Sequence, residues 1–211
     1  LNDRVCDSNT ETMGANAAKM EGADSCRTFC ETYGVSEEAY KNAVAAFKKI
    51  AGSTKKEMTR KQFTKTLLQK YPSEFADLIF NTFDTDGNGT MSLSEFLVYM
   101  GLSNGGSVEQ KLQGSFMLFD KDHNGQLERD EVITCFQTLL HSSLYKHYVE
   151  THDGKKPKDL VLTDAQKAEI ITVVGALFDT LDADKNGTID MEEFVNGFKT
   201  HPDLCQPMMQ F

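Results

Sequence analysis

Three twelve-residue segments of this chain carry oxygen-bearing side chains at a fixed, repeated spacing. They read DTDGNGTMSLSE from Asp84, DKDHNGQLERDE from Asp120 and DADKNGTIDMEE from Asp182. Calcium takes about six to eight oxygen ligands, and a twelve-residue loop can supply them from positions 1, 3, 5, 7, 9 and 12. Acids or amides fill positions 1, 3 and 5 of every segment, and a glutamate fills position 12. The spacing therefore predicts three Ca2+ sites.

The expected ligands follow from those positions, with position 7 contributing its backbone carbonyl. In the first loop they are Asp84, Asp86, Asn88, Thr90, Ser92 (through water) and Glu95. In the second loop they are Asp120, Asp122, Asn124, Gln126, Glu128 and Glu131. In the third loop they are Asp182, Asp184, Asn186, Thr188, Asp190 and Glu193. The charge that Asp190 adds makes Mg2+ a candidate occupant of the third loop in the resting state.

The remaining loop positions support the same interpretation. Position 6, where the chain must turn sharply, is a glycine in all three loops, and position 8 is apolar: Met91, Leu127 and Ile189. The alternative is that each acidic turn only caps a helix. A cap needs one or two acids, whereas these loops place five oxygen-bearing groups in a constant order, so we favour cation binding.

The elements that position the loops are predicted to be helices. The loops begin at 84, 120 and 182, so their intervals are 36 and 62 residues, and the longer one holds an insert at about 142–162 that should form an exposed loop. Helix starts are indicated at Ser36, at Ser107 with Gln110, and at Thr163 with Gln166, because Ser and Thr favour N-caps. The expected fold is all-α, with helix–loop–helix units in two paired lobes.

Four such units are expected, and the first has lost its ligands. Aligning Phe63 with Phe96 and Phe194 places a loop at 51–62. Its position 1 is Ala51 and its position 12 is Gln62, and lysines stand at positions 5 and 6. Two lysines where a dication would sit predict that this degenerate loop binds no ion.

The expected domain organisation has three parts. Residues 1–34 are polar and mixed, and we expect them to be flexible. Residues 35–103 form the N-terminal lobe, with the degenerate first unit and the active second. Residues 107–211 form the C-terminal lobe, with the third and fourth units and a short C-terminal tail helix. The boundary is expected at Gly105–Gly106.

Composition narrows the class of protein. The net charge of -10 and the pI near 5.0 argue against nucleic acid as a partner. Five irregularly spaced cysteines favour a reducing compartment, so we expect a cytoplasmic location. No apolar stretch approaches the roughly 20 residues that span a membrane. Cation binding accounts for every polar cluster, so we do not expect an enzyme.

Three stretches resemble the neuronal calcium sensor (recoverin-like) family of EF-hand proteins. They are FADLIFNTFDTDGNGTMSLSEF, SVEQKLQGSFMLFDKDHNGQLERDE and EEFVNGFKTHPDLCQPMMQF, and the resemblance covers about residues 36–211. It implies four EF-hands in two lobes, with a disabled first hand. It also implies a hydrophobic groove that opens with Ca2+ and accepts an amphipathic helix of a protein target.

The chain departs from that family pattern in three places. Ala51–Gly52 stand where the family's first hand has Cys-Pro, and the insert before the last hand is longer than expected. The family's N-terminal glycine for myristoylation is not at the start of this chain. Met13–Gly14 is a poor substitute, because Ala18 stands where Ser or Thr is needed. Membrane association is therefore left open without a clear lipidation motif.

These observations predict a calcium sensor that regulates a target protein. Two alternatives remain: a cytosolic calcium buffer, which keeps the loops but barely opens, and a regulatory subunit of an enzyme, similar to calcineurin B. The oligomeric state and the identity of the target do not follow from the sequence.

Overall fold

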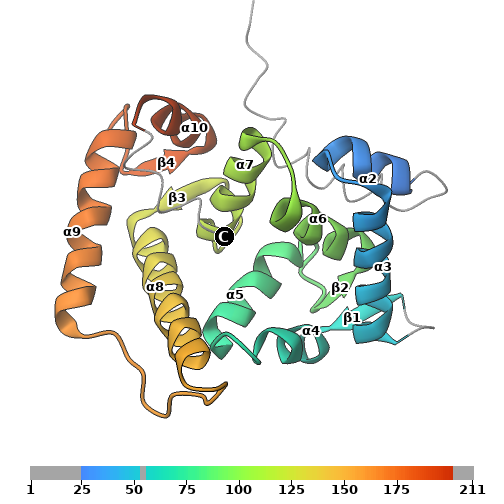
Figure 1. Ribbon diagram of the computed structural model, residues 1–211. Helices are drawn as coiled ribbons and strands as arrows, with labels where there is room; N and C mark the ends of the chain where they lie inside the picture. Colours follow the sequence, from blue (N-terminus) through green and yellow to red (C-terminus); the bar gives the residue numbers. More distant parts are fainter. Residues whose placement is uncertain (1–24, 53–55, 202–211) are drawn as a thin grey trace, which may run out of the picture. The chain divides into compact units, whose positions relative to one another are not determined.

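The computed structural model describes residues 25–52 and 56–201, and these residues are mostly helical (Figure 1). The prediction of a helical fold is confirmed. By their internal contacts the described residues divide into two compact units. Unit 1 contains the described residues up to Phe63 together with Phe80–Ser115. Unit 2 contains Thr64–Ile79 together with the described residues from Phe116 onwards.

The helices and strands follow the predicted alternation of helix and loop. The helices are α2 (Ser25–Tyr33), α3 (Glu37–Ala51), α4 (Arg60–Leu67), α5 (Ser73–Phe83), α6 (Leu93–Asn104), α7 (Val108–Phe119), α8 (Arg129–Thr151), α9 (Asp164–Leu181) and α10 (Met191–Thr200). The strands are β1 (Glu57–Thr59), β2 (Thr90–Ser92), β3 (Gln126–Glu128) and β4 (Thr188–Asp190). Each acidic loop therefore runs from the end of one helix, through a three-residue strand, into the next helix.

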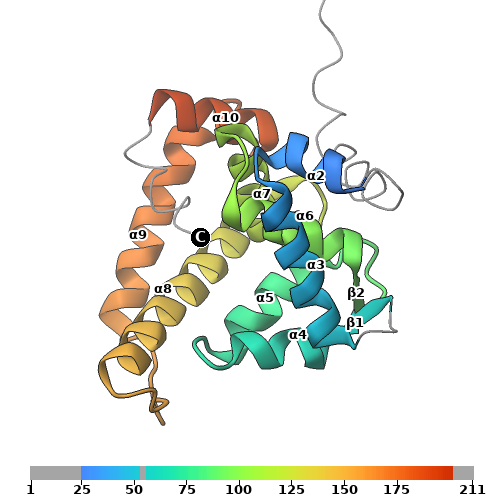
Figure 2. The same cartoon turned by 45° about the vertical axis from the view of Figure 1, so that its right-hand side comes forward.

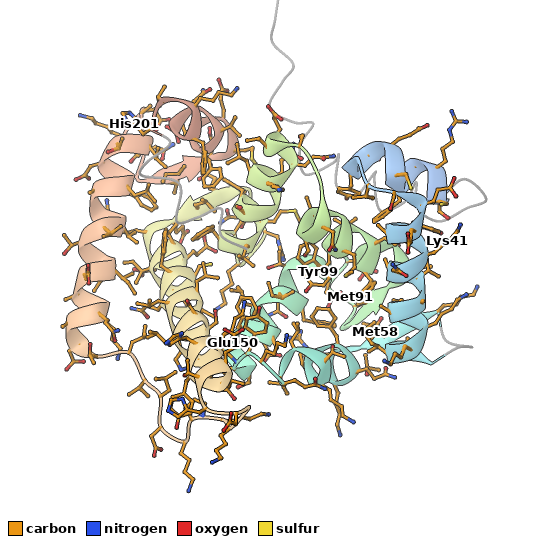
Figure 3. All side chains as sticks on the ribbon, in the orientation of Figure 1. Lys41, Met58, Met91, Tyr99, Glu150 and His201 are labelled. Atoms are coloured by element: carbon orange, nitrogen blue, oxygen red, sulfur yellow. The ribbon has the colours of Figure 1, made fainter. Side chains whose placement is uncertain are left out.

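The short strands pair the loops two by two. β1 lies antiparallel to β2 with Met58 opposite Met91, which Figure 3 shows, and β3 lies antiparallel to β4 with Leu127 opposite Ile189. All four side chains are at most 1% exposed. Position 8 of each acidic loop is therefore apolar because it packs against the partner loop, as the sequence predicts.

Aromatic side chains form the core of unit 1. The rings of Phe47 on α3 and Phe96 on α6 lie 5.6 Å apart, and those of Phe63 on α4 and Phe80 on α5 lie 5.8 Å apart. Tyr99 packs edge-on against Phe63 at 5.6 Å. Contacts of this kind join the helices on both sides of the paired β1 and β2 loops, so the position of one helix depends on the others.

Unit 2 repeats this construction around β3 and β4. Phe116 on α7 meets Phe194 on α10, with ring centroids 5.5 Å apart, and Leu181 at the end of α9 packs against Gly197 of α10. The helices α8 and α9 lie side by side in both views of the molecule (Figures 1 and 2). Phe116 and Phe194 are both at most 1% exposed, so they belong to the centre of this core.

The helix α2 corrects the expectation that residues 1–34 are flexible. Its Phe29 and Tyr33 are 1% and 3% exposed, and the backbone N–H of Gly106 donates to the Tyr33 carbonyl at 2.7 Å. Only nine residues long, α2 draws its stability from packing rather than from propensity, which explains why local sequence did not reveal it. The expectation for residues 1–24 lies outside the described residues.

The insert expected at 142–162 is also more ordered than predicted. The helix α8 continues to Thr151, and the loop is confined to the residues between Thr151 and Thr163. Leu144, Tyr145, Tyr148 and Val149 keep a helical spacing, and no glycine or proline interrupts the chain before Gly154. The helix ends at Thr151, and the Gly154 N–H closes its last turn by donating to the Val149 carbonyl at 3.0 Å.

The predicted helix starts are confirmed. The Ser36 hydroxyl accepts from the Ala39 N–H at 3.2 Å, and Thr163 forms a reciprocal capping box with Gln166. The tail helix lies outside the described residues, and the boundary at Gly105–Gly106 stays a prediction.

The docking of α2 can be tested at Gly101, which lies on α6 against the Tyr33 ring with no room for a Cβ atom. We expect Gly101→Ala to lower the free energy of unfolding by about 1–3 kcal/mol, because the ring must move. The control is Gly175→Ala on α9, where the nearest atom is the flexible end of Arg129 at 3.4 Å. This control should stabilise the protein by about 0.5–1 kcal/mol. Denaturant unfolding of both variants measures the difference, and equal effects would contradict the packing described.

Candidate metal centres

Each predicted loop brings its acids together. In the loop at 84–95, ligand atoms of Asp84, Asp86 and Glu95 lie within 4.8 Å of one another. The same holds for Asp120, Asp122 and Glu131, and for Asp182, Asp184 and Glu193. These are the side chains at positions 1, 3 and 12. Carboxylates this close repel one another, so the arrangement suits a hard cation with oxygen ligands.

The remaining predicted ligands shape the loops. The asparagine at position 5 accepts a hydrogen bond from the N–H of position 7, as in the 2.7 Å bond from Thr90 to Asn88 Oδ1. Gln126 and Thr188 make the equivalent bonds to Asn124 and Asn186, both at 2.8 Å. Position 9, which is Ser92, Glu128 or Asp190, is the N-cap of the helix that leaves the loop.

The glycine at position 6 ties each loop to its first aspartate. The N–H groups of Gly89, Gly125 and Gly187 each donate at 3.0 Å to the Oδ2 atom of the aspartate five residues earlier. Their φ angles lie between +79° and +90°, in the left-handed region that favours glycine. The turn that the three loops share therefore directs a backbone donor at the carboxylate expected to hold the ion.

The glutamate at position 12 joins the two ends of its loop. Glu95 Oε1 accepts from the Thr85 N–H at 2.9 Å, and its Oε2 accepts from the Ser92 N–H at 2.8 Å. In the other loops, the bonds are Lys121 to Glu131 at 2.9 Å, Glu128 to Glu131 at 3.0 Å, Ala183 to Glu193 at 2.8 Å and Asp190 to Glu193 at 3.1 Å. Because this residue belongs to the outgoing helix, a cation that it binds would act directly on that helix.

The loop at 84–95 is the one in which both the first aspartate and the last glutamate are buried. Asp84 and Glu95 are 7% and 4% exposed. In the second loop Asp120 is 3% exposed but Glu131 is half-buried, and in the third loop both acids are half-buried. Among the described residues, Asp84 Oδ1 is the one buried side-chain oxygen or nitrogen without a hydrogen-bond partner. A buried carboxylate oxygen without a donor is costly unless a cation satisfies it. The donor set therefore fits Ca2+.

Burial also changes the acidity of the first aspartates. Desolvation raises the pKa of Asp84, and the nearby Glu95 and Asp86 carboxylates raise it further, although the Gly89 N–H opposes the shift. Desolvation likewise raises the pKa of Asp120, with a contribution from Glu131. In the ion-free protein, these groups carry a charge that their surroundings disfavour, and a bound cation would reverse that preference.

The two ends of the segment 51–62 are joined in another way. The Gln62 side-chain amide donates to the carbonyls of Ile50 and Ala51, both at 3.2 Å, and its Oε1 accepts from the Thr59 N–H at 2.9 Å. An amide can both donate and accept, so Gln62 connects the end of α3 to the start of α4 without a cation. Among the described residues, no acidic metal-binding group forms here.

Sequence reasoning missed two contributors to these sites. One is the bridging role of Gln62, which the sequence analysis treated only as a lost ligand. The other is the Thr85 hydroxyl, which donates to Glu95 Oε1 at 3.0 Å from a position that the ligand pattern leaves free. Neither has a sequence signal apart from its place in the loop.

Comparison with known proteins agrees with this geometry. Two models of an EF-hand domain pair match residues 54–101 and 109–199. Neuronal calcium sensor 1 of Lymnaea stagnalis is 28% identical over 203 residues, which cover 93% of this chain and 96% of that protein. Guanylyl cyclase inhibitory protein of Lithobates pipiens is 30% identical over 138 residues, 65% of this chain and 60% of that protein. Human guanylyl cyclase-activating protein 3 is 27% identical over 139 residues, 66% of this chain and 57% of that protein.

None of the described helices is long and apolar enough to cross a membrane.

The cost of the unpaired Asp84 oxygen can be measured in chelator. We expect Asp84→Asn to raise the melting temperature of the ion-free protein by about 2–4 °C, because it removes a disfavoured charge. The same variant should lose the part of the stabilisation by Ca2+ that the loop at 84–95 contributes, while the other two loops keep theirs. The control is Glu150→Gln, which changes the net charge equally at an exposed site of α8 and should alter neither value.

The pH dependence supplies a second measurement of the same effect. Because the folded pKa of Asp84 lies above its value of 3.8 in the unfolded chain, the native state takes up the proton first as the pH falls. The Asp84 contribution should therefore make the ion-free protein more stable as the pH is lowered through that raised pKa. Asp84→Asn should flatten this part of the profile, and an unchanged profile would contradict the assignment.

The bridge at Gln62 gives a test that needs no metal. We expect Gln62→Ala to lower the free energy of unfolding in chelator by about 1–3 kcal/mol, because it leaves the Ile50 and Ala51 carbonyls and the Thr59 N–H without this partner. Gln137→Ala, at a half-buried position of α8, serves as a control with little expected change. Equal losses in the two variants would contradict the bridging role.

Proposed function

We propose that this chain, which is an EF-hand protein resembling the neuronal calcium sensor (recoverin-like) proteins, acts as a calcium sensor that regulates a target protein. The observation that carries the proposal is the unpaired, buried Oδ1 of Asp84 within one of three equivalent carboxylate clusters. Such an arrangement is costly without a cation and favourable with one. The chain is therefore expected to change its stability and its conformation when Ca2+ binds.

The proposed occupancy is three Ca2+ ions, one in each loop that begins at Asp84, Asp120 and Asp182. The ligands are those at positions 1, 3, 5, 7, 9 and 12, with Mg2+ in the third loop at rest. The segment α3–β1–α4 is proposed to be a fourth, degenerate hand that binds no ion. It pairs β1 with β2 as a functional hand would, and Gln62 takes the structural place of the glutamate.

The proposed mechanism begins at the position-12 glutamate. In each loop this residue bonds the loop start while standing in the first turn of the outgoing helix. A Ca2+ ion that takes both carboxylate oxygens would pull on that helix, and sensor EF-hands respond by reorienting helix pairs and exposing an apolar groove. The closely packed aromatic cores of the two units supply the surface that such a movement could uncover.

The proposed partner is an amphipathic helix of a target protein. Groove-binding helices contribute apolar side chains at helical spacing, which suits a surface rich in phenylalanine. The relatives named above as a guanylyl cyclase inhibitory protein and a guanylyl cyclase-activating protein act on a protein, which supports a protein target here. We further propose a cytoplasmic location, which the free thiols of Cys26, Cys30 and Cys135 support.

The sensor proposal predicts both a stoichiometry and an opening. Calorimetric titration should find three Ca2+ ions per chain, and Glu131→Gln should remove one. An apolar fluorescent dye should bind the Ca2+ form more strongly than the chelated form, because the groove is open only with Ca2+. Gln137→Ala, on the same helix as Glu131, should leave the count unchanged.

Other outcomes would point to other functions. Three bound ions without a change in dye binding would indicate a buffer. A stable complex with a target in both Ca2+ and chelator would indicate a permanent regulatory subunit. Fewer than two ions at micromolar Ca2+ would overturn the calcium count.

A further inference from the structure

A threonine hydroxyl distinguishes the loop at 84–95 from the other two. Thr85, at position 2, donates to Glu95 Oε1 twice, through its backbone N–H at 2.9 Å and its Oγ1 at 3.0 Å. The equivalent residues are Lys121 and Ala183, which have no hydroxyl group. They donate to their own glutamates through the backbone N–H, at 2.9 and 2.8 Å, and the N–H of position 3 adds longer bonds of 3.3 and 3.4 Å. No hydroxyl takes part at position 2 of these two loops.

The second oxygen of Glu95 is held in a similar way. Glu95 Oε2 accepts from the Ser92 N–H at 2.8 Å and from the Ser92 Oγ at 2.9 Å. The equivalent residues in the other loops are Glu128 and Asp190, whose carboxylates have no proton to donate. Each Glu95 oxygen therefore accepts from one backbone N–H and one hydroxyl, and Glu95 is 4% exposed, so water competes little for these bonds.

We propose that Thr85 makes the loop at 84–95 selective for Ca2+ over Mg2+ by fixing both carboxylate oxygens of Glu95. The proposal rests on the calcium binding proposed above. Thr85 is a positioning residue, because it acts through Glu95 and is not itself expected to bind the ion. Thr85 controls how many of its two carboxylate oxygens Glu95 presents to the ion.

The physical reason is the difference between the two ions. Ca2+ accepts six to eight ligands at about 2.3–2.6 Å, so it can take both oxygens of one carboxylate. Mg2+ requires a near-ideal octahedron at about 2.0–2.1 Å, so it takes one. To offer a single oxygen, the Glu95 carboxylate must turn and break charge-assisted hydrogen bonds on one side. The Thr85 hydroxyl raises the cost of that turn.

The other two loops should discriminate less strongly against Mg2+. Glu131 and Glu193 each lack hydroxyl donors from positions 2 and 9, and both are half-buried. Position 9 in these loops carries a carboxylate, which adds negative charge for a small, strongly charged ion. The three loops should therefore differ in selectivity, with the loop at 84–95 the most specific for Ca2+.

The test requires a signal from each loop in the intact chain. The amide groups of Gly89, Gly125 and Gly187 provide it, because each donates to the first aspartate of its own loop. Their NMR resonances, followed during titration with Ca2+ or Mg2+ against a competing chelator, give six affinities. The variants are Thr85→Val, which keeps the shape without the hydroxyl, and Thr85→Ser, which keeps the hydroxyl.

We expect Thr85→Val to lower the ratio of Ca2+ to Mg2+ affinity at the loop of Gly89 by about tenfold, the size of one charge-assisted hydrogen bond. Most of the change should come from tighter Mg2+ binding. Thr85→Ser should restore the ratio, and the other two loops should change by less than about twofold. In the converse experiment, Ala183→Thr adds a hydroxyl to the third loop and should raise the ratio at the loop of Gly187. The Ala183 N–H already donates to Glu193 Oε1 at 2.8 Å, as the Thr85 N–H does to Glu95 Oε1 at 2.9 Å.

The outcomes separate this inference from the function on which it rests. If Gly89 responds to Ca2+ but Thr85→Val leaves the ratio unchanged, or raises it, the role of Thr85 is overturned and the calcium sites stand. An equal loss of both affinities would mean a merely structural role and would also overturn it. If Gly89 of the unaltered chain does not respond to Ca2+, the calcium proposal itself fails.

Discussion

The structure depends on the gathering of like charges in a confined space. Three carboxylates within 4.8 Å of one another repel in every acidic loop, and in the loop at 84–95 two of them are also buried. The protein limits the cost with backbone donors, such as the Gly89 N–H to Asp84, but it leaves Asp84 Oδ1 without one. A bound cation would supply the missing partner and relieve the repulsion. If it does so better in one conformation than in another, its binding would shift the equilibrium between them.

The carboxylate loops are joined to the rest of each unit by two connections. The first is the position-12 glutamate, which belongs to the outgoing helix but bonds to the start of its loop. The second is the apolar contact at position 8, where Met58 meets Met91 and Leu127 meets Ile189 in strands with little room to adjust. A change in one loop would therefore affect its paired loop and two helices. In the proposed mechanism, the aromatic contacts that join those helices would convert the movement of a carboxylate into a movement of the core.

Much of this arrangement could be predicted from the sequence, because a loop of twelve residues contains nearly all of its own ligands. The apolar position 8 and the caps at Ser36 and Thr163 are equally local, and they also were predicted correctly. What the sequence did not reveal depends on distant packing. The helix α2 exists because Phe29 and Tyr33 are buried by residues more than ten positions away, with Tyr33 lying against Gly101. The extension of α8 to Thr151 was missed because the whole insert at 142–162 was interpreted as a loop, although apolar residues keep a helical spacing in its first part.

The paired loops at 51–62 and 84–95 show two solutions to one geometric problem, the joining of an incoming helix to an outgoing one. Gln62 solves it with a neutral amide, which donates to carbonyls at the end of α3 and accepts from Thr59. Glu95 accepts from both ends of its loop but donates to neither, so it brings a charge that the loop cannot neutralise. The first solution needs no cation, whereas the second leaves a buried charge that the proposed cation would neutralise. Because β1 and β2 are paired, the segment held by Gln62 would stay in place in the proposed mechanism while the loop at 84–95 responds to the ion. A hand without ligands would then still contribute, as the fixed half against which the other half moves.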